Sequence, residues 1–118
     1  MQPIVVKFGG SSLATAAQFE KVAAIVRENP ARRYVVASAP GKRFSGDTKV
    51  TDLLYRLYDE AAAGADFSMT LGEIRQRFED IIAALGLQAD LSEDFAAIEA
   101  HLRAKPQRDY MASRGEYL

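Results

Sequence analysis

The sequence contains no cysteine, so disulfide bonds and thiolate metal ligands are excluded. It also lacks any apolar run near the roughly 20 residues that a helix needs to cross a bilayer. Residues 1–3 have neither the basic segment nor the apolar segment with which a secretory signal begins. We therefore expect an intracellular protein, located in the cytoplasm.

Neither sign of charge dominates, because 15 basic residues stand against 16 acidic ones and the net charge is −1. No basic stripe alternates with aromatic residues, so nucleic-acid binding is not favoured. The single histidine, His101, lies near Glu99 and Arg103 without other metal ligands at suitable spacing, and we expect no metal site. The 118 residues, 48% of them hydrophobic, suffice for one domain with a core.

The beginning of the chain predicts a strand, a helix and a second strand. Residues 4–8 and 34–39 are short apolar runs rich in β-branched side chains, which is typical of buried strands. Between them, residues 16–28 carry apolar side chains at helical spacing, and Thr15 is placed to cap that helix. Two nearly continuous apolar strands joined by a helix favour a right-handed parallel βαβ unit.

The remainder of the chain predicts helices and no third strand. The expected helices are residues 51–63, 66–85, 92–104 and 107–118. Gly64 and Gly86 are expected to end the first two of these, and Ser92 to cap the third. The fold class is therefore α/β, a parallel βαβ unit followed by a helix-rich segment.

An isolated two-stranded sheet is marginal in water, and the sequence stops inside an expected helix. We therefore expect the parent protein to continue beyond this sequence. We also expect the exposed strand edges to be covered by another copy of the chain, which would make the protein a homo-oligomer.

The turn after the first strand, residues 7–12, has the composition of an anion site. Gly9, Gly10 and Ser11 are small, so backbone N–H groups can approach an anion closely. A helix amino terminus adds partial positive charge, and Lys7 adds a full charge at the end of the strand. The turn matches neither the Walker phosphate loop nor G-x-G-x-x-G. A glycine pair that merely forms a βα turn is the alternative, but the lysine and serines favour a nucleotide polyphosphate.

The loop after the second strand is expected at the same rim, because ligands of open parallel sheets gather at the carboxyl ends of the strands. Ser38 ends that strand, and Thr51 opens the next helix and presents a second hydroxyl. Alternatively, Ser38 has no role beyond ending the strand, and Thr48 or Thr51 caps the helix. Three cations on the loop either attract an anionic ligand or are simply solvated: Lys42, Arg43 and Lys49.

The last segment, residues 113–116, reads Ser-Arg-Gly-Glu. A glycine inside a helix costs about 1 kcal/mol relative to alanine, so Gly115 suggests the close approach of another group. Glu116 can accept a hydrogen bond from an ammonium group, although a helix terminus with surface charges is the alternative. Earlier, carboxylates alternate with Arg75 and Arg77, which we interpret as a solvated helix face. The apolar stripe of residues 67–85 favours core or subunit interface over a cofactor site.

Three segments together resemble the aspartate kinases of the amino-acid kinase superfamily. They are VVKFGGSSL at residues 5–13, VVASA at 35–39 with KVTDLL at 49–54, and SRGEYL at 113–118. The first segment suits several kinases of the superfamily, and the third points to aspartate as the acceptor. The loop of residues 40–49 is longer than in many members. The resemblance implies that residues 1–118 are the amino-terminal portion of an amino-acid kinase domain, without its remainder and without the ACT regulatory domains.

The resemblance implies transfer of the γ-phosphoryl group of ATP, accompanied by Mg²⁺, to the side-chain carboxylate of L-aspartate. Such a transfer depends mainly on positioning and charge neutralisation. As the catalytic residue, Lys7 would neutralise the transferring group, while Gly9, Gly10 and Ser11 would cradle phosphate oxygens. The product, 4-phospho-L-aspartate, leads to lysine, threonine and methionine.

On the substrate side, the resemblance implies that Ser38 and Thr51 line the aspartate site and that Glu116 binds the aspartate amino group. The base pocket and a further arginine of the family are missing from these residues, so we expect the chain alone to be inactive or nearly so. Two alternatives remain open. One is a non-catalytic module that binds nucleotide or a partner, and the other is a related kinase for another acid such as N-acetylglutamate.

Overall fold

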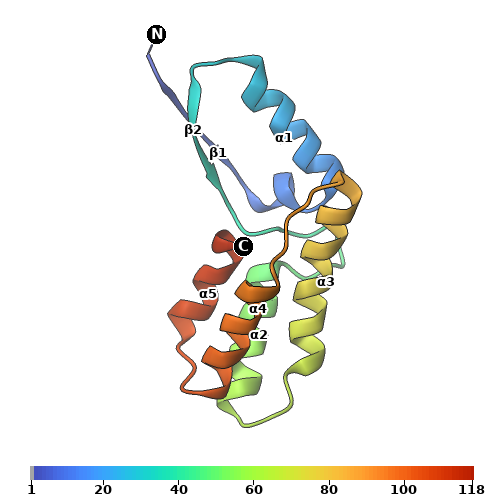
Figure 1. Ribbon diagram of the computed structural model, residues 1–118, viewed down its shortest axis with the longest axis vertical. Coiled ribbons are helices and arrows are strands. Elements are labelled where there is room, and N and C mark those ends of the chain that lie inside the picture. Colours follow the sequence, from blue (N-terminus) through green and yellow to red (C-terminus); the bar gives the residue numbers. More distant parts are fainter. Residues whose placement is uncertain (1) are drawn as a thin grey trace.

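The computed structural model describes residues 2–118 and contains the predicted βαβ unit. Strands β1 (Ile4–Phe8) and β2 (Arg32–Ala37) pair in parallel, and helix α1 (Ala16–Glu28) connects them (Figure 1). The Thr15 side chain accepts a hydrogen bond from the Gln18 amide, so the predicted helix cap is confirmed. Strand β2 begins and ends two residues earlier than predicted, which leaves Ser38 just beyond the strand.

The rest of the chain forms four helices, and they contain the hydrophobic core. They are α2 (Val50–Ala62), α3 (Ser68–Leu85), α4 (Ser92–Arg103) and α5 (Arg108–Tyr117). Their fully buried side chains include Leu54, Leu57, Ile74 and Ile98. Gly64 and Gly86 follow the ends of α2 and α3 with φ of 72° and 66°, conformations that side chains disfavour. None of the helices described is long and apolar enough to cross a membrane.

The cap predicted for α4 is wrong. Leu91 occupies the cap position, and Ser92 is the first helical residue. The Asp90 carboxylate accepts a hydrogen bond from the Ser92 amide at 2.9 Å, while the Ser92 hydroxyl accepts one from Arg75 at 3.0 Å. The Asp90 carboxylate, two residues before Ser92 in the sequence, therefore accepts the hydrogen bond from the first turn in place of the serine hydroxyl.

The two strands are not buried in this chain, contrary to the sequence prediction. Val5 and Tyr34 are 66% and 59% exposed, and Val35 and Val36 are also exposed. The reason is that α1 is the element that packs against the sheet, and α1 itself contains no buried residue. The apolar strand pattern describes a sheet with cover on both faces, which the described residues, 2–118, do not supply.

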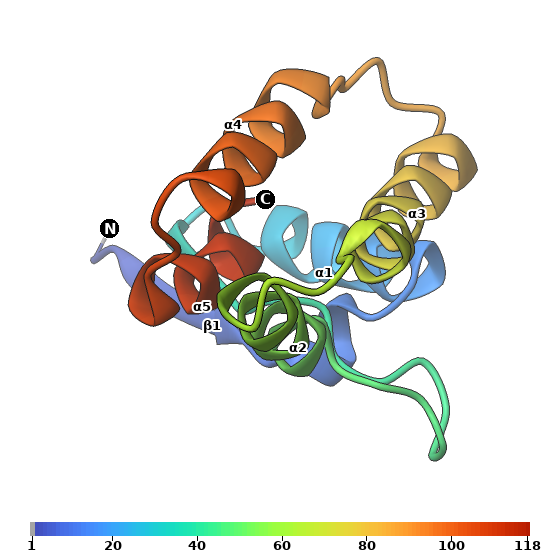
Figure 2. The ribbon, with the colours of Figure 1, turned by 90° about the horizontal axis from the view of Figure 1, so that it is seen from below.

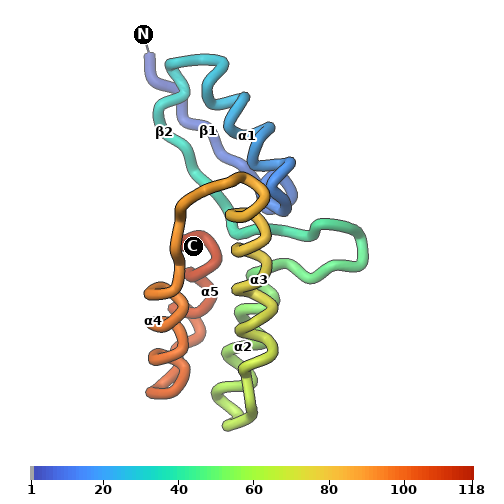
Figure 3. Tube along the Cα trace, turned by 45° about the vertical axis from the view of Figure 1, so that its right-hand side comes forward, coloured from blue at the N-terminus to red at the C-terminus, as the bar shows by residue number. Residues whose placement is uncertain are grey.

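The molecule is elongated, with extents of 52 × 29 × 27 Å. Figure 1 shows the βαβ unit at one end and the four helices at the other. The carboxyl ends of both strands point toward the helices, and the end of α5 lies at this junction (Figure 1). The loop of residues 40–49 projects from the same region, as Figures 2 and 3 show from two further directions. The rim predicted to bind ligands therefore lies where the two parts of the molecule meet.

Candidate functional site

A polar cavity of about 480 Å³ lies at this junction. Five of the residues predicted for the site line it, and they come from three distant parts of the sequence: Gly10, Ser11, Ser38, Thr51 and Glu116. The other lining residues are Ala39, Pro40, Gly41, Lys42 and Lys49. The structure thus brings the glycine turn, the second loop and the last helix to one cavity.

The glycine turn enters the cavity through a short 3₁₀ helix, η1 (Gly10–Leu13), which separates β1 from α1. The sequence did not predict this extra turn. Gly9 precedes it in an extended conformation, and the Gly9 carbonyl accepts a hydrogen bond from the Ser12 amide at 3.1 Å. The turn is joined to the second loop because the Gly41 amide donates to the Gly10 carbonyl at 2.8 Å.

The two loops touch through glycine backbones. A Cβ atom on Gly41 would lie 2.7 Å from the Gly10 carbonyl carbon and 2.9 Å from the Ser11 nitrogen. Such contacts are too short for a real side chain, and backbone atoms cannot rotate away as a side chain would. Glycine at position 41 is therefore required by the distance between the two loops.

The second loop passes from β2 to α2 along the cavity. The Ser38 amide donates to the Phe8 carbonyl at 3.2 Å, which extends the parallel pairing by one residue. Helix α2 begins after Lys49, and no side chain caps it, so the alternative that Thr48 or Thr51 is a helix cap is wrong. Instead, the Pro40 carbonyl accepts a hydrogen bond from the Val50 amide at 3.0 Å. The Thr51 side chain is left free to line the cavity.

Helix α5 places Glu116 at the cavity by packing its glycine against the second loop. A Cβ atom on Gly115 would lie only 2.5 Å from the Ala39 Cβ and 3.4 Å from a methyl carbon of Leu54. The prediction that Gly115 allows a close approach is therefore confirmed. Because Glu116 directly follows this buried contact, its position relative to Ser38 and Thr51 depends on it.

Two residues of the predicted site stand apart from the cavity. Lys7 is exposed near the end of β1, where it pairs with Val36, and neither Lys7 nor Gly9 lines the cavity within the described part of the chain. The three cations of the second loop also differ in whether they line the cavity. Lys42 and Lys49 line the cavity, whereas Arg43 forms an ion pair with Asp47 at 2.6 Å.

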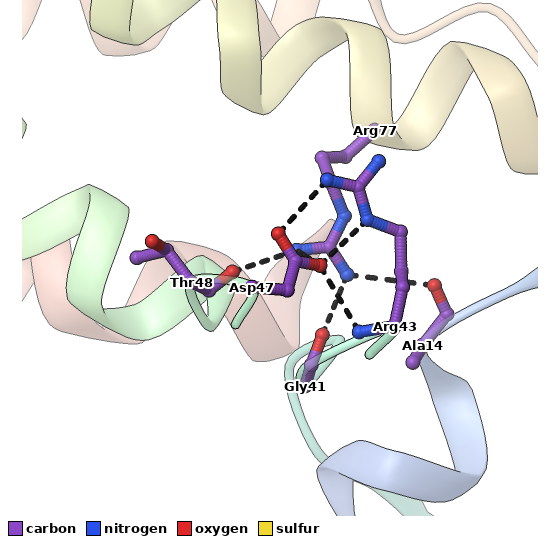
Figure 4. Close-up of polar contacts among 6 residues, drawn as sticks. All are labelled: Ala14, Gly41, Arg43, Asp47, Thr48 and Arg77. Atoms are coloured by element: carbon purple, nitrogen blue, oxygen red, sulfur yellow. Dashed lines mark hydrogen bonds and ion pairs between the residues drawn. The ribbon is translucent and has the colours of Figure 1, made fainter. Parts of the chain in front are cut away.

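The interpretation of Arg77 as part of a solvated helix face is wrong. Arg77 projects from α3 into the protein and is only 4% exposed. Figure 4 shows its guanidinium among the backbone carbonyls of Ala14, Gly41 and Thr48, which accept hydrogen bonds at 3.4, 2.6 and 3.0 Å. The sequence did contain a signal, because position 77 lies three residues after Ile74 and four before Ile81, on the buried side of the helix.

Asp47 interacts with two arginines, Arg43 and Arg77. Asp47 receives two hydrogen bonds from the Arg43 guanidinium, at 2.6 and 2.9 Å, and lies 3.8 Å from Arg77. These Arg43 hydrogen bonds hold the pKa of Asp47 well below its usual range. Burial lowers the pKa of Arg77, and nearby Arg43 lowers it further, while Asp47 opposes both. Arginine nevertheless keeps its charge, so the cluster contains two cations and one anion.

His101 has a structural partner. Its Nε2 atom accepts a hydrogen bond from the Gln107 amide at 2.9 Å, at the turn between α4 and α5. Its ring packs on Tyr110 with the ring centres 3.9 Å apart. Within residues 2–118 we find no cluster of three histidine or carboxylate side chains suited to a metal ion.

The glycine turn, Ser38, Thr51, Glu116 and two lysines share one cavity at the carboxyl ends of parallel strands, and the fold around this cavity matches part of an aspartate kinase. Comparisons with known proteins show that the chain is similar to aspartate kinases. No protein-family model matches the sequence. The chain is 45% identical over 89 residues to aspartokinase 3 of Bacillus subtilis (strain 168), a match that covers 75% of this chain and 20% of that protein.

Two solved structures agree with this match. The aspartate kinase of Clostridium acetobutylicum superimposes with a TM-score of 0.95 at 38% identity, covering 99% of this chain and 27% of that one. E. coli aspartokinase III, solved in complex with aspartate and ADP, gives a TM-score of 0.75 at 26% identity, covering 98% of this chain and 26% of that one. The chain is therefore a relative of the aspartate kinases, as its motifs predicted, and spans about a quarter of the length of the solved ones.

Proposed function

We propose that residues 1–118 form the amino-terminal portion of an amino-acid kinase domain that phosphorylates L-aspartate with ATP. The observation that carries this proposal is the single cavity shared by Gly10, Ser11 and Glu116. These residues belong to the turn that we propose to hold the phosphates and to the segment that resembles the aspartate-recognising helix. The related E. coli enzyme was solved with both aspartate and ADP, which supports the same pair of ligands here.

In the proposed reaction, a carboxylate oxygen of aspartate attacks the γ-phosphorus of ATP, and the bond from that phosphorus to the bridging oxygen of ADP breaks. Negative charge on the phosphoryl oxygens must be stabilised as this happens. The backbone of Gly9, Gly10 and Ser11 would hold phosphate oxygens, and Lys7 would supply a positive charge beside them. Mg²⁺ would accompany ATP, bound to its phosphates.

On the acceptor side, Glu116 would bind the ammonium group of aspartate, and Ser38 and Thr51 would donate hydrogen bonds to its carboxylates. Lys42 and Lys49 line the same cavity and would raise the local concentration of anionic ligands. The product, 4-phospho-L-aspartate, would enter the synthesis of lysine, threonine and methionine. The proposal also includes a cytoplasmic location and a homo-oligomeric assembly.

Steady-state kinetics with a series of acceptors test this proposal. The protein is expressed at the full length that its gene encodes, and ADP formation from Mg·ATP is followed with L-aspartate, N-acetyl-L-glutamate or no acceptor. We expect turnover that depends on L-aspartate. Turnover with N-acetyl-L-glutamate alone would assign a different acceptor. Nucleotide binding without turnover on any acid would favour the non-catalytic module instead. The 118-residue chain alone is expected to give little or no turnover.

The contact between the two loops provides a second test. Gly41→Ala is expected to raise the Kd for Mg·ATP about fivefold, because the new Cβ would separate the glycine turn from the second loop. Gly46→Ala is the matched control, since it lies in the same loop and a Cβ there would meet nothing within 4 Å. Isothermal titration calorimetry measures both constants. Equal Kd values for the two variants would show that the loop contact does not matter for binding.

A further inference from the structure

Arg77 is a buried cation that no step of the proposed reaction uses. It comes from α3, outside the segments that line the polar cavity, and its guanidinium reaches three backbone carbonyls. Two of these, Gly41 and Thr48, belong to the loop between β2 and α2, and the third, Ala14, directly follows η1. One side chain therefore contacts both the glycine turn and the second loop, which line the cavity together.

The shortest of these contacts leads directly to the glycine turn. Arg77 donates to the Gly41 carbonyl at 2.6 Å, and the Gly41 amide donates to the Gly10 carbonyl at 2.8 Å. A single residue, Gly41, thus connects the guanidinium to Gly10, the first residue of η1. Since a Cβ on Gly41 would overlap Gly10, the two loops are already in backbone contact, and a displacement of Gly41 must displace Gly10 as well.

The geometry requires an arginine. A planar guanidinium has five N–H donors in a fixed arrangement, so it can bind several carbonyls that lie in different directions. Arg77 uses Nη1 for Thr48 and Nη2 for both Ala14 and Gly41. Lysine would bring the same charge on a flexible stem, but its ammonium group is too compact to join all three. Asp47, held by Arg43, provides the countercharge at 3.8 Å from Arg77 (Figure 4).

Stability alone is a weak explanation for this arrangement. Removing an arginine from water is costly, and apolar side chains of similar volume often replace buried ionic groups with little loss of stability. The cost is visible here, because the Nε atom of Arg77 is buried without a hydrogen-bond partner in the described structure. What an apolar side chain cannot do is hold three carbonyls of two loops in one fixed relation.

We propose that Arg77 is a positioning residue, which fixes the glycine turn that would hold the phosphates relative to the second loop that would hold the acceptor. It acts through Gly41 and Gly10 and does not touch the nucleotide. This inference rests on the proposed function in one respect, namely that the ligand of the glycine turn is a nucleotide polyphosphate.

The test compares Arg77→Met and Arg77→Lys with Arg75→Met in the full-length protein. Arg75 lies on the same helix and forms an exposed ion pair with Glu79, so it controls for the loss of a charge from α3. Three quantities are measured: the Kd for Mg·ADP by calorimetry, the hydrogen-exchange rate of the Gly41 amide, and the midpoint of thermal unfolding. The Gly41 amide is informative because its hydrogen bond joins the two loops.

For Arg77→Met we expect a Kd about 10-fold higher and a Gly41 amide that exchanges at least about 10-fold faster, since the loops no longer share a fixed partner. Arg77→Lys should restore part of each effect, and Arg75→Met should change neither. A lower unfolding midpoint with unchanged Kd and unchanged exchange would overturn the proposal, because Arg77 would then be merely structural.

Two further outcomes remain decisive. If Arg77→Met does not fold, Arg77→Lys tests the proposal by the same two readouts, and unchanged values of both would overturn it. Absence of nucleotide binding by the unmodified protein would refute the proposed function, while the exchange rate of the Gly41 amide would still test the loop connection.

Discussion

Replacing Lys7 by methionine is expected to lower kcat for aspartate phosphorylation about 100-fold or more, the usual consequence of removing one group that stabilises charge in a transition state. Methionine has nearly the same length and removes only the charge. Lys7 is exposed near the carboxyl end of β1, and no ion pair of the described residues involves it. Because none of these ion pairs neutralises its ammonium group, Lys7 would be free to pair with a phosphoryl group held at the glycine turn.

Steady-state kinetics of the full-length protein separate this role from simple ligand attraction. A charge that acts in the transition state lowers kcat, whereas one that only attracts ATP raises KM and leaves kcat unchanged. Lys21→Met removes an exposed lysine from α1, away from the cavity, and serves as the control. Lys7→Arg keeps the charge with a different shape and should recover only part of the activity. A kcat within about threefold of the unmodified value for Lys7→Met would contradict the assignment.

Gly115→Ala is expected to destabilise the protein by about 1–3 kcal/mol, the usual cost of inserting a methyl group into a filled site. The added Cβ would lie 2.5 Å from the Ala39 Cβ, so α5 would have to move away from the second loop. Since the next residue is Glu116, the same movement would displace the carboxylate at the cavity. We therefore expect the KM for aspartate to rise in this variant together with the loss of stability.

Gly72→Ala in α3 gives the opposite expectation and is the control. A Cβ at position 72 would meet nothing within 4 Å, so the helix should gain about 1 kcal/mol from the better helix-forming residue. Urea denaturation of both variants measures the two free energies of unfolding. If Gly115→Ala proved as stable as Gly72→Ala, the close packing of α5 against Ala39 could not be required for the fold.

Features that depend on neighbouring residues could be predicted from the sequence. The bounds of α1 agree because Thr15 caps one end and Asn29 followed by Pro30 stops the other. The ends of α2 and α3 follow from two glycines that take positive φ values. The grouping of the glycine turn with Ser38 also follows from a general rule, because parallel strands end at the same edge of a sheet. The resemblance to aspartate kinases added Glu116, which lies in the same cavity.

Features that depend on contacts between distant segments could not be predicted in the same way. The partners of Arg77 lie 29, 36 and 63 residues away, so alternating charges alone suggested a solvated face. The 3₁₀ turn of Gly10–Leu13 is held in part by Gly41, from the other loop. The exposure of the strands was not predicted, because an apolar strand sequence indicates that both faces of the strand must be buried. It does not indicate whether this chain or other residues bury them.

The separation between a bare sheet and a filled helical core has a consequence for local unfolding. Helix α2 packs against α3, α4 and α5 in a shared core, whereas β1 and β2 lie outside that core with α1 beside them. With Val5, Tyr34 and Val36 in water, little apolar burial holds the strand pair together once formed. The βαβ unit should therefore open at a lower cost in free energy than the helical core, and the glycine turn, which directly follows β1, should open with it.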